Sequence, residues 1–195
     1  MKVVFTPWLR GNVVRLVLAA VLTTSSIAYG QHSLDLDGHA FNPLQGDREK
    51  VVVLVFLRRD CPISSRYAPT IKRISKLYAG SASFWLVFPD KTESAQTIRK
   101  YLQDYGYTLP ALRDPEHELV KLSRVQATPE AAVFDRNRQL IYDGRIDDWY
   151  RYPGGSRPAP TTHDLADAVS AVIAGKSMDK TNEVRGVGCY ISDLE

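Results

Sequence analysis

The sequence DCPISSRYAP at residues 60–69 separates two regular patterns of apolar residues. Before it, residues 51–57 read VVVLVFL, an unbroken apolar run in which most residues are β-branched. That length and composition predict a strand buried on both faces of a sheet. After it, apolar residues recur at helical spacing and predict a helix over residues 64–79, kinked by Pro69 and ended by Gly80.

Cys61 therefore lies where the predicted strand passes into the predicted helix. Backbone N–H groups and the dipole at a helix N-terminus stabilise a thiolate, which is the nucleophilic form of cysteine. The alternative is that Cys61 packs as a small buried hydrophobe, as free cysteine often does. The position between strand and helix favours the reactive thiol, so Cys61 is the first candidate catalytic residue.

Strand and helix patterns alternate through the next sixty or so residues. Residues 84–88 read FWLVF and predict a second buried strand, and residues 95–105 have helical spacing. Asp114 is a suitable N-cap with Pro115 at the first helical position, so a short helix is expected to begin there. His117 would then be a solvated residue of that helix.

The C-terminal half predicts a β-hairpin over residues 131–143 and a helix over residues 163–174, with a long loop at residues 147–162 between them. A loop of that length is either a functional flap or a surface ornament. Two parallel strands followed by an antiparallel hairpin predict an α/β fold whose mixed central sheet is flanked by helices.

Composition is that of a globular protein, with 44% hydrophobic and 24% charged residues. The net charge of +3 comes from residues 1–30, which carry three basic residues and no acidic ones. The remainder of the chain is neutral, so no basic surface for nucleic acid is expected.

Residues 1–30 are expected to be a signal peptide. The basic residues precede or flank an apolar run at residues 16–22, and Ala28 and Gly30 are small residues suited to cleavage before Gln31. The alternative is an uncleaved membrane anchor, but a spanning helix needs about 20 apolar residues. The predicted organisation is a signal peptide, a domain at residues 31–175 and a tail at residues 176–195, in a protein exported to the periplasm or the cell exterior.

The chain has two cysteines, Cys61 and Cys189, and the second lies in the predicted tail. An even number of cysteines in an oxidising compartment permits a disulfide. The alternative is that Cys189 is a free or intermolecular cysteine near a frayed end. The sequence leaves both possibilities open.

Three short motifs follow one another along the chain. Cys61-Pro62-Ile63-Ser64 has the form CxxS, Ala68-Pro69 follows in the same predicted helix, and Thr128-Pro129 precedes the predicted hairpin. In this order, over residues 34–175, the chain resembles the thioredoxin-like superfamily, and within it the exported redoxins related to bacterial thiol–disulfide proteins and peroxiredoxins.

The resemblance implies a thioredoxin-like fold and thiol–disulfide or antioxidant redox chemistry on thiol or disulfide proteins or small thiols. Cys61 would be the nucleophile, with Ser64 as a hydrogen-bond partner of its thiolate. Thr128 and Pro129 would shape the substrate groove, with Pro129 in the cis form. No metal or other cofactor is implied, and the four histidines have no metal-ligand spacing.

The chain departs from the family pattern because Ser64 replaces the second cysteine of CxxC. A serine cannot resolve a mixed disulfide, so the candidate for this role within the chain is Cys189. Asp60 would raise the pKa of Cys61, whereas nearby arginines would lower it, and the sequence leaves the sum undecided.

Two other functions remain open. One is a binding module that keeps the fold but has lost turnover. The other is a thiol peroxidase, although Arg58 stands where peroxiredoxins have a threonine. Copper delivery is disfavoured because that family uses CxxxC, and here the corresponding position is Ser65.

Overall fold

The computed structural model describes residues 1, 33–176, 178 and 184–192. The expected signal peptide lies outside the described residues, apart from Met1. Within the described ranges, none of the helices has the length and apolar character needed to cross a membrane.

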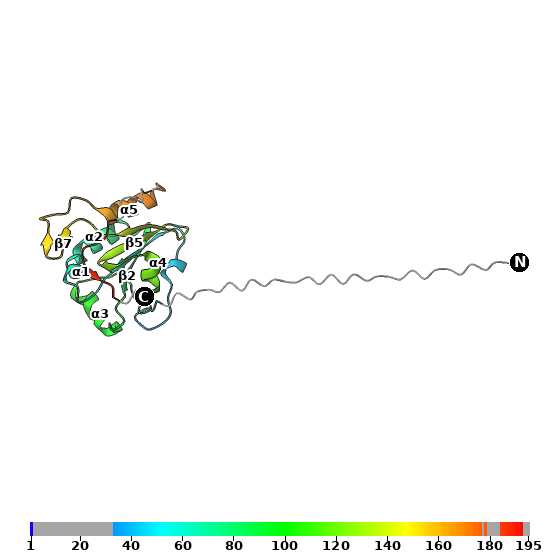
Figure 1. Ribbon diagram of the computed structural model, residues 1–195, viewed down its shortest axis with the longest axis horizontal. Coiled ribbons are helices and arrows are strands. Elements are labelled where there is room, and N and C mark those ends of the chain that lie inside the picture. The colour runs from blue at the N-terminus through cyan, green and yellow to red at the C-terminus, as the bar shows by residue number, and fades with distance from the viewer. Residues whose placement is uncertain (2–32, 177, 179–183, 193–195) are drawn as a thin grey trace.

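A five-stranded mixed sheet forms the centre of the domain (Figure 1). Its strand order is β3-β2-β1-β5-β6, and β1 pairs in parallel with β2, as β2 does with β3. The hairpin of β5 and β6 is added in antiparallel orientation, with β5 next to β1. The strands are β1 (Val51–Phe56), β2 (Ala82–Phe88), β3 (Ala111–Arg113), β5 (Glu130–Phe134) and β6 (Leu140–Gly144). The predicted mixed sheet is therefore confirmed.

All six residues of β1 are buried, which explains why the run at residues 51–57 lacks polar positions. Successive side chains point to opposite faces of a strand. Val53 and Val55 accordingly pack on one face, whereas Leu54 and Phe56 belong to the core on the other face. Burying one such side chain stabilises the fold by about 1.5–3 kcal/mol.

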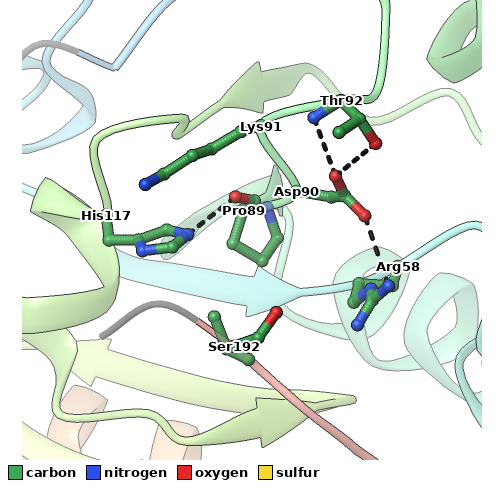
Figure 2. A pocket seen from close by; sticks show the side chains of 8 residues that line it. Arg58, Pro89, Asp90, Lys91, Thr92, His117 and Ser192 are labelled. Carbon is green, nitrogen blue, oxygen red and sulfur yellow. Dashed lines mark hydrogen bonds and ion pairs between the residues drawn. The ribbon is translucent and has the colours of Figure 1, made fainter. Parts of the chain in front are cut away.

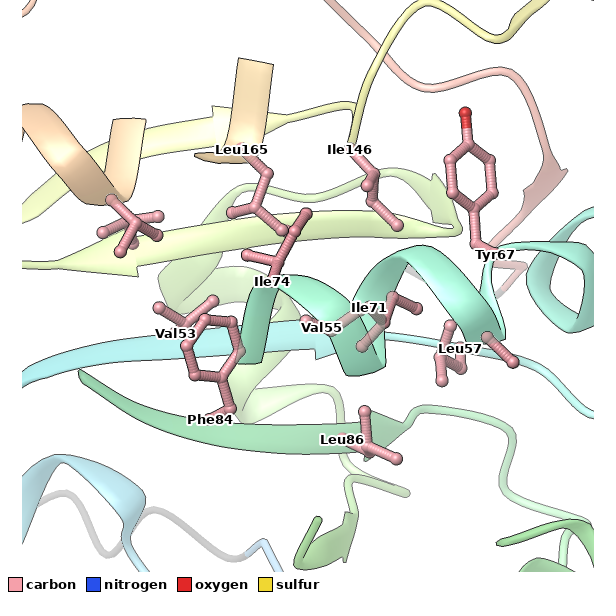
Figure 3. Packing of buried hydrophobic residues seen from close by; sticks show 14 of the residues in the cluster. Val53, Val55, Leu57, Tyr67, Ile71, Ile74, Phe84, Leu86, Ile146 and Leu165 are labelled. Atoms are coloured by element: carbon pink, nitrogen blue, oxygen red, sulfur yellow. The ribbon is translucent and has the colours of Figure 1, made fainter. Parts of the chain in front are cut away.

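Helices α2 (Ala68–Leu77) and α5 (Asp164–Ile173) cover the first of these faces. Ile71 and Ile74 of α2 and Leu165 of α5 belong to the same core as Val53 and Val55 of β1, and the side chains of Ile74 and Leu165 are directed toward each other (Figure 3). On the other face, α4 (Glu118–Ser123) contributes Leu119 to the second core. The sheet is thus flanked by helices on both sides.

The helix expected over residues 64–79 is two helices, α1 (Pro62–Arg66) and α2. Tyr67 ends the first and caps the second, and its N–H donates to the carbonyls of Ile63 and Ser64 at 3.2 Å. Pro69 lies in the first turn of α2, where a missing N–H leaves no helical hydrogen bond unmade. The proline therefore starts a helix instead of kinking one.

The expected start of α4 is also wrong. The helix begins at Glu118, and its N-cap is His117 in a left-handed conformation with φ 57°. The Asp114 carboxylate still accepts a hydrogen bond from the Val120 N–H at 2.9 Å, so it pairs with a free backbone N–H in the first turn of the helix although it is not the N-cap residue. His117, expected to be solvated, is instead buried at 3% exposure, and its Nε2 lies 2.9 Å from the Pro89 carbonyl oxygen.

The long loop and the tail contain strands that the sequence did not predict. In the loop, β7 (Tyr150–Tyr152) and β8 (Gly155–Ser156) form a small antiparallel hairpin. In the tail, β9 (Cys189–Tyr190) pairs antiparallel with β4 (Ala127–Thr128). The remaining elements are helix α3 (Ala95–Asp104) and a short 3₁₀ helix, η1 (Pro43–Gln45).

Candidate active site

Cys61 follows β1 and is the N-cap residue of α1, as the sequence predicts. Its backbone is extended, with φ −86° and ψ 109°, and its carbonyl accepts the Ser65 N–H at 3.3 Å. The side chain is completely buried, and its sulfur lies 3.2 Å from the carbonyl oxygen of Thr128. The nucleophile candidate therefore faces β4 from the start of a helix.

The Thr128–Pro129 peptide bond is cis, as the resemblance predicts. Thr128 is fully buried, and its carbonyl is the group that accepts the hydrogen bond from the Cys61 thiol. The segment before the hairpin thus meets the N-terminus of α1 directly.

Cys189 lies in the same cluster, although it is far from Cys61 in the sequence. In the pairing of β4 with β9, Cys189 is opposite Thr128, and the Thr128 hydroxyl donates to the Cys189 carbonyl at 3.4 Å. Both cysteines are free thiols, and Thr128 contacts each of them, through its carbonyl with the Cys61 thiol and through its hydroxyl with the Cys189 carbonyl. The structure therefore brings together Cys61, Ser64, Thr128, Pro129 and Cys189, all five residues that the sequence nominated.

Two glycines allow this close approach. A Cβ at Gly188 would overlap the backbone carbonyl of Thr128, and a Cβ at Gly186 would lie 2.8 Å from the Pro129 carbonyl oxygen. Because neither glycine has a Cβ, the backbone of the tail packs against the cis-proline segment.

The pKa of Cys61 lies below its ordinary value because opposing effects do not cancel. Burial raises the pKa, but hydrogen bonds from the Cys189 thiol and from the backbone and hydroxyl of Ser64 lower it by more. The Ser64 hydroxyl is itself buried and accepts the Arg58 N–H at 3.4 Å. The Thr128 carbonyl binds only the protonated thiol, whereas the other partners remain available to the thiolate.

The pKa of Cys189 moves in the opposite direction, to about 12, owing to burial, the hydrogen bond with Cys61 and the charge of the Cys61 thiolate. The environment thus favours the thiolate at Cys61 and the protonated thiol at Cys189, which is the order needed when Cys61 is the nucleophile or the leaving group.

Arg58 connects the loop after β1 to the tail. Its guanidinium forms ion pairs with Asp60 at 2.9 Å and Asp90 at 3.2 Å, and donates to the Tyr190 carbonyl at 3.4 Å. Figure 2 shows the contact with Asp90, which also accepts hydrogen bonds from Thr92. Arg58, Asp90 and Thr92 line a pocket of about 200 Å³ that Ile191 and Ser192 of the tail also border.

Two buried acidic residues hold the part of the tail that precedes Cys189. Glu130 is completely buried, and its carboxylate accepts the Gly186 N–H at 2.7 Å and the Gln126 N–H at 2.8 Å. Arg185 forms an ion pair with buried Asp143 at 3.0 Å. Cys189 is thus held between two anchored segments, which the sequence pattern did not reveal.

A second pocket, of about 330 Å³, opens beside Cys189 between α1 and the β7–β8 hairpin. Its walls are mostly apolar and include Ile63, Tyr150 and Pro153, with Arg66 at the edge. The hairpin is anchored by Tyr67, whose hydroxyl donates to the Asp147 carboxylate at 2.6 Å. The aromatic, glycine-rich and proline-rich composition of residues 147–162 was the sequence signal for this wall.

Among the described residues, no group of three or more histidine, cysteine or acidic side chains could hold a metal ion.

Comparison with known proteins agrees with this architecture. Residues 48–140 match a family model described as thioredoxin-like. The fold is thioredoxin-like. The comparison with curated proteins gave no match.

Solved structures match most of the chain. A hypothetical protein from Sinorhizobium meliloti is 26% identical with a TM-score of 0.69, covering 81% of this chain and 87% of that one. An uncharacterised conserved protein from Geobacillus kaustophilus is 22% identical with a TM-score of 0.67, covering 81% and 85%. A secreted Mycobacterium tuberculosis disulfide oxidoreductase homologous to E. coli DsbE is 16% identical with a TM-score of 0.53, covering 72% and 96%.

Proposed function

We propose that this protein is an exported thiol–disulfide oxidoreductase whose redox-active pair is Cys61 and Cys189. The observation that carries the proposal is that both cysteines meet at Thr128: the Cys61 thiol donates to the Thr128 carbonyl at 3.2 Å, and Cys189 lies opposite Thr128 in the pairing of β4 with β9. The lowered pKa of Cys61 agrees with this arrangement. A thiolate next to a second thiol is the starting point for disulfide exchange. Ser64 acts as a donor to the thiolate, and Thr128 and Pro129 position both sulfurs.

The reaction exchanges two electrons and two protons. The two protein thiols become a disulfide while a substrate disulfide becomes two thiols, and the reverse reaction oxidises a substrate dithiol. In the order expected from the CxxC pattern, Cys61 attacks a sulfur of the substrate disulfide and releases the first substrate thiol. Cys189 then attacks Cys61 in this mixed disulfide and releases the second, so closure of the protein disulfide needs no outside thiol. The serine of the CxxS motif is then no obstacle to turnover, because the resolving partner comes from β9.

Export is part of the proposal because the predicted signal peptide would deliver the protein to a compartment where disulfides persist. Two proteins of similar fold are themselves secreted or exposed: the secreted Mycobacterium tuberculosis disulfide oxidoreductase and an exposed lipoprotein thioredoxin from Streptococcus pneumoniae. The substrates would be thiol or disulfide proteins or small thiols.

The first experiment is the intact mass of the mature protein with and without reductant, followed by a disulfide map. We expect the oxidised protein to lose the mass of two hydrogen atoms and the map to join Cys61 to Cys189. Two free thiols after equilibration with oxidised glutathione would refute the redox pair. A thiol–disulfide turnover assay then compares the wild type with Cys61→Ser and Cys189→Ser, and each variant is expected to lose multiple turnover.

The two other functions give different results in the same assays. A binding module would retain partner capture in Cys61→Ser and would show no turnover in the wild type. A thiol peroxidase would oxidise Cys61 on mixing with hydrogen peroxide. Arg58, the arginine in the loop before Cys61, already pairs with Asp60 and Asp90.

A further inference from the structure

The two sulfurs of the proposed redox pair differ in access to solvent. Cys61 has no exposed surface, whereas Cys189 is partly exposed and lines the apolar pocket between α1 and the β7–β8 hairpin. A thiolate that attacks a disulfide must reach one of its sulfurs. Cys189 lines this pocket and Cys61 does not. With the tail in place, a molecule bound in the pocket can therefore contact Cys189 but not Cys61.

Reaching Cys61 directly would require the tail to leave its position. Several contacts hold the tail on both sides of Cys189, and they come from different parts of the fold. They are the Arg145 N–H to the Val184 carbonyl, Arg185 to Asp143, the Gly186 N–H to Glu130, Arg58 to the Tyr190 carbonyl, and the Ile191 N–H to the Gln126 carbonyl. Access through Cys189 breaks none of them.

We propose that Cys189, and not Cys61, is the sulfur that exchanges with substrates, and that the adjoining pocket takes the apolar side chain flanking the reactive cysteine of a peptide or protein. The inference rests on the proposed redox pair and adds the order in which its two sulfurs act. It reverses the order expected from the CxxC pattern, in which the cysteine at the helix N-terminus meets the substrate.

The exchange is balanced without any further reactant. A substrate thiolate attacks the Cys189 sulfur of the protein disulfide, a bond forms between these two sulfurs, and the Cys61–Cys189 bond breaks. Its electron pair goes to Cys61, which leaves as a thiolate that Ser64 stabilises. The second thiolate of a substrate dithiol then attacks the substrate sulfur in the mixed disulfide, and Cys189 leaves and takes up a proton. The substrate is oxidised to a disulfide, and the protein is reduced to two thiols.

The proposed order of attack also agrees with the relative ability of the two cysteines to act as leaving groups. In disulfide exchange the sulfur with the lower thiol pKa leaves faster. The pKa of Cys61 is lowered and that of Cys189 is raised to about 12, so attack on Cys189 releases the better leaving group. Attack on Cys61 would release the poorer one.

The pocket favours an apolar neighbour of the substrate cysteine. Apolar surface is provided by Pro62, Ile63, Tyr150 and Pro153, and the small residues Gly154 and Ser156 also line the pocket. Burial of an apolar side chain there would hold the substrate thiol next to Cys189. Arg66 donates to the Tyr150 hydroxyl at 3.3 Å, which fixes α1 and the hairpin relative to each other.

The test determines which of the two cysteines forms the mixed disulfide with a substrate peptide. The disulfide of the oxidised wild-type protein is mapped first, and a synthetic peptide with one cysteine between two leucines is then added. The reaction is quenched with acid at early times, free thiols are blocked with N-ethylmaleimide, and the digest is analysed by mass spectrometry. We expect the peptide on Cys189 and maleimide on Cys61. The peptide on Cys61 and maleimide on Cys189 would overturn the inference and leave the redox pair intact, whereas a missing disulfide in the first map would refute the redox pair itself.

Two variants test the route of entry. Ser156→Trp places a large side chain at the pocket wall and is expected to slow adduct formation about fivefold or more, whereas Ser170→Trp on the exposed side of α5 is the matched control and leaves the rate unchanged. Arg185→Ala removes the ion pair with Asp143 and loosens the tail. If substrates enter at Cys189 this variant keeps the wild-type rate, and a faster reaction would show that the tail must open.

Discussion

The replacement of Gly188 by alanine tests whether the tail covers Cys61. A Cβ at this position would meet the carbonyl group of Thr128 and the nitrogen of Pro129, which are backbone atoms that cannot turn aside. The tail of Gly188→Ala therefore cannot keep its position on β4. We expect Cys61 to become accessible to alkylating reagents.

The size of the effect follows from the contacts that hold the segment. Three hydrogen bonds connect residues 189–191 to Arg58, Gln126 and Thr128, and each contributes about 0.5–1.5 kcal/mol. Burial of the Ile191 side chain, which is 7% exposed, adds about 1.5–3 kcal/mol. Opening of the tail in the wild type thus costs at least about 3 kcal/mol, and since 1.4 kcal/mol is a factor of ten, Cys61 should react about a hundred times faster in the variant.

The assay is the rate of alkylation of Cys61 by iodoacetamide in the fully reduced protein, followed by peptide mass. Gly80→Ala is the matched control, because a Cβ there meets nothing within 4 Å. Circular dichroism checks that both variants are folded. If Cys61 reacts equally fast in the wild type and in Gly188→Ala, the tail does not protect it and the reasoning fails.

Four further results are expected. Ser64→Ala removes a donor to the Cys61 thiolate and should raise the pKa of Cys61, as seen in the pH dependence of thiolate absorbance; an unchanged titration would exclude this role for the hydroxyl. Burial raises the pKa of Glu93, so the stability that it contributes is present below its unfolded pKa and is lost as the pH rises through the folded value. Glu93→Gln should therefore flatten the loss of stability as the pH rises above the unfolded pKa of glutamate in urea denaturation, and a curve parallel to the wild type would contradict it. Ile71→Ala, at a fully buried position of α2, should lower the free energy of unfolding by about 2–5 kcal/mol in the same assay, and a loss below 1 kcal/mol would place Ile71 outside the core. Oxidation to the Cys61–Cys189 disulfide should raise that free energy by about 5 kcal/mol, as measured with and without dithiothreitol; equal values would mean that the pair does not close the loop.

Most of the sheet could be predicted because its signals are local. The apolar runs at residues 51–57 and 84–88 have the composition of buried strands, and both are central strands of the sheet. The hairpin over residues 131–143 was marked by its turn and is β5 and β6. The order of these elements along the chain was enough to predict the mixed sheet.

The helix boundaries failed where capping depends on tertiary contacts. Asp114 and Pro115 have the composition of a helix start, but the chain turns at His117, whose ring is fixed by the Pro89 carbonyl. Likewise Pro69 marks the start of α2, because Tyr67 ends one helix and caps the next. Both errors concern which of several acceptable residues begins a helix, and distant groups decide this.

The members of the site could be nominated from the sequence, but their arrangement could not. Cys61 was identifiable from its position between strand and helix, Thr128 and Pro129 from the resemblance, and Cys189 from the number of cysteines and the serine of the CxxS motif. The pairing of β4 with β9 covers two residues on each strand, which is too short for any periodic signal. It depends on glycines that fit against the cis-proline segment and on buried acids that anchor the tail.

The separation of the two sulfurs in the sequence gives this proposed disulfide a different energetic character from that of a CxxC motif. Closing a four-residue loop in the unfolded chain costs about 2 kcal/mol in the entropic account, whereas closing the loop between Cys61 and Cys189, which are 128 positions apart, costs about 5 kcal/mol. The folded protein has already met this cost, since β4 and β9 hold both cysteines in place whether or not the bond is formed. By linkage, folding therefore favours the disulfide by about 3 kcal/mol more than it favours a CxxC disulfide of equal strain, equivalent to about 60 mV in reduction potential.

The hydrogen bonds that lower the pKa of Cys61 act in the opposite direction, because they stabilise the reduced form. The redox poise of the pair is thus set by two separate parts of the structure, the anchoring of the tail and the donors around Cys61. Gly188→Ala and Ser64→Ala should accordingly shift the reduction potential in opposite directions, upward for the loosened tail and downward for the missing donor.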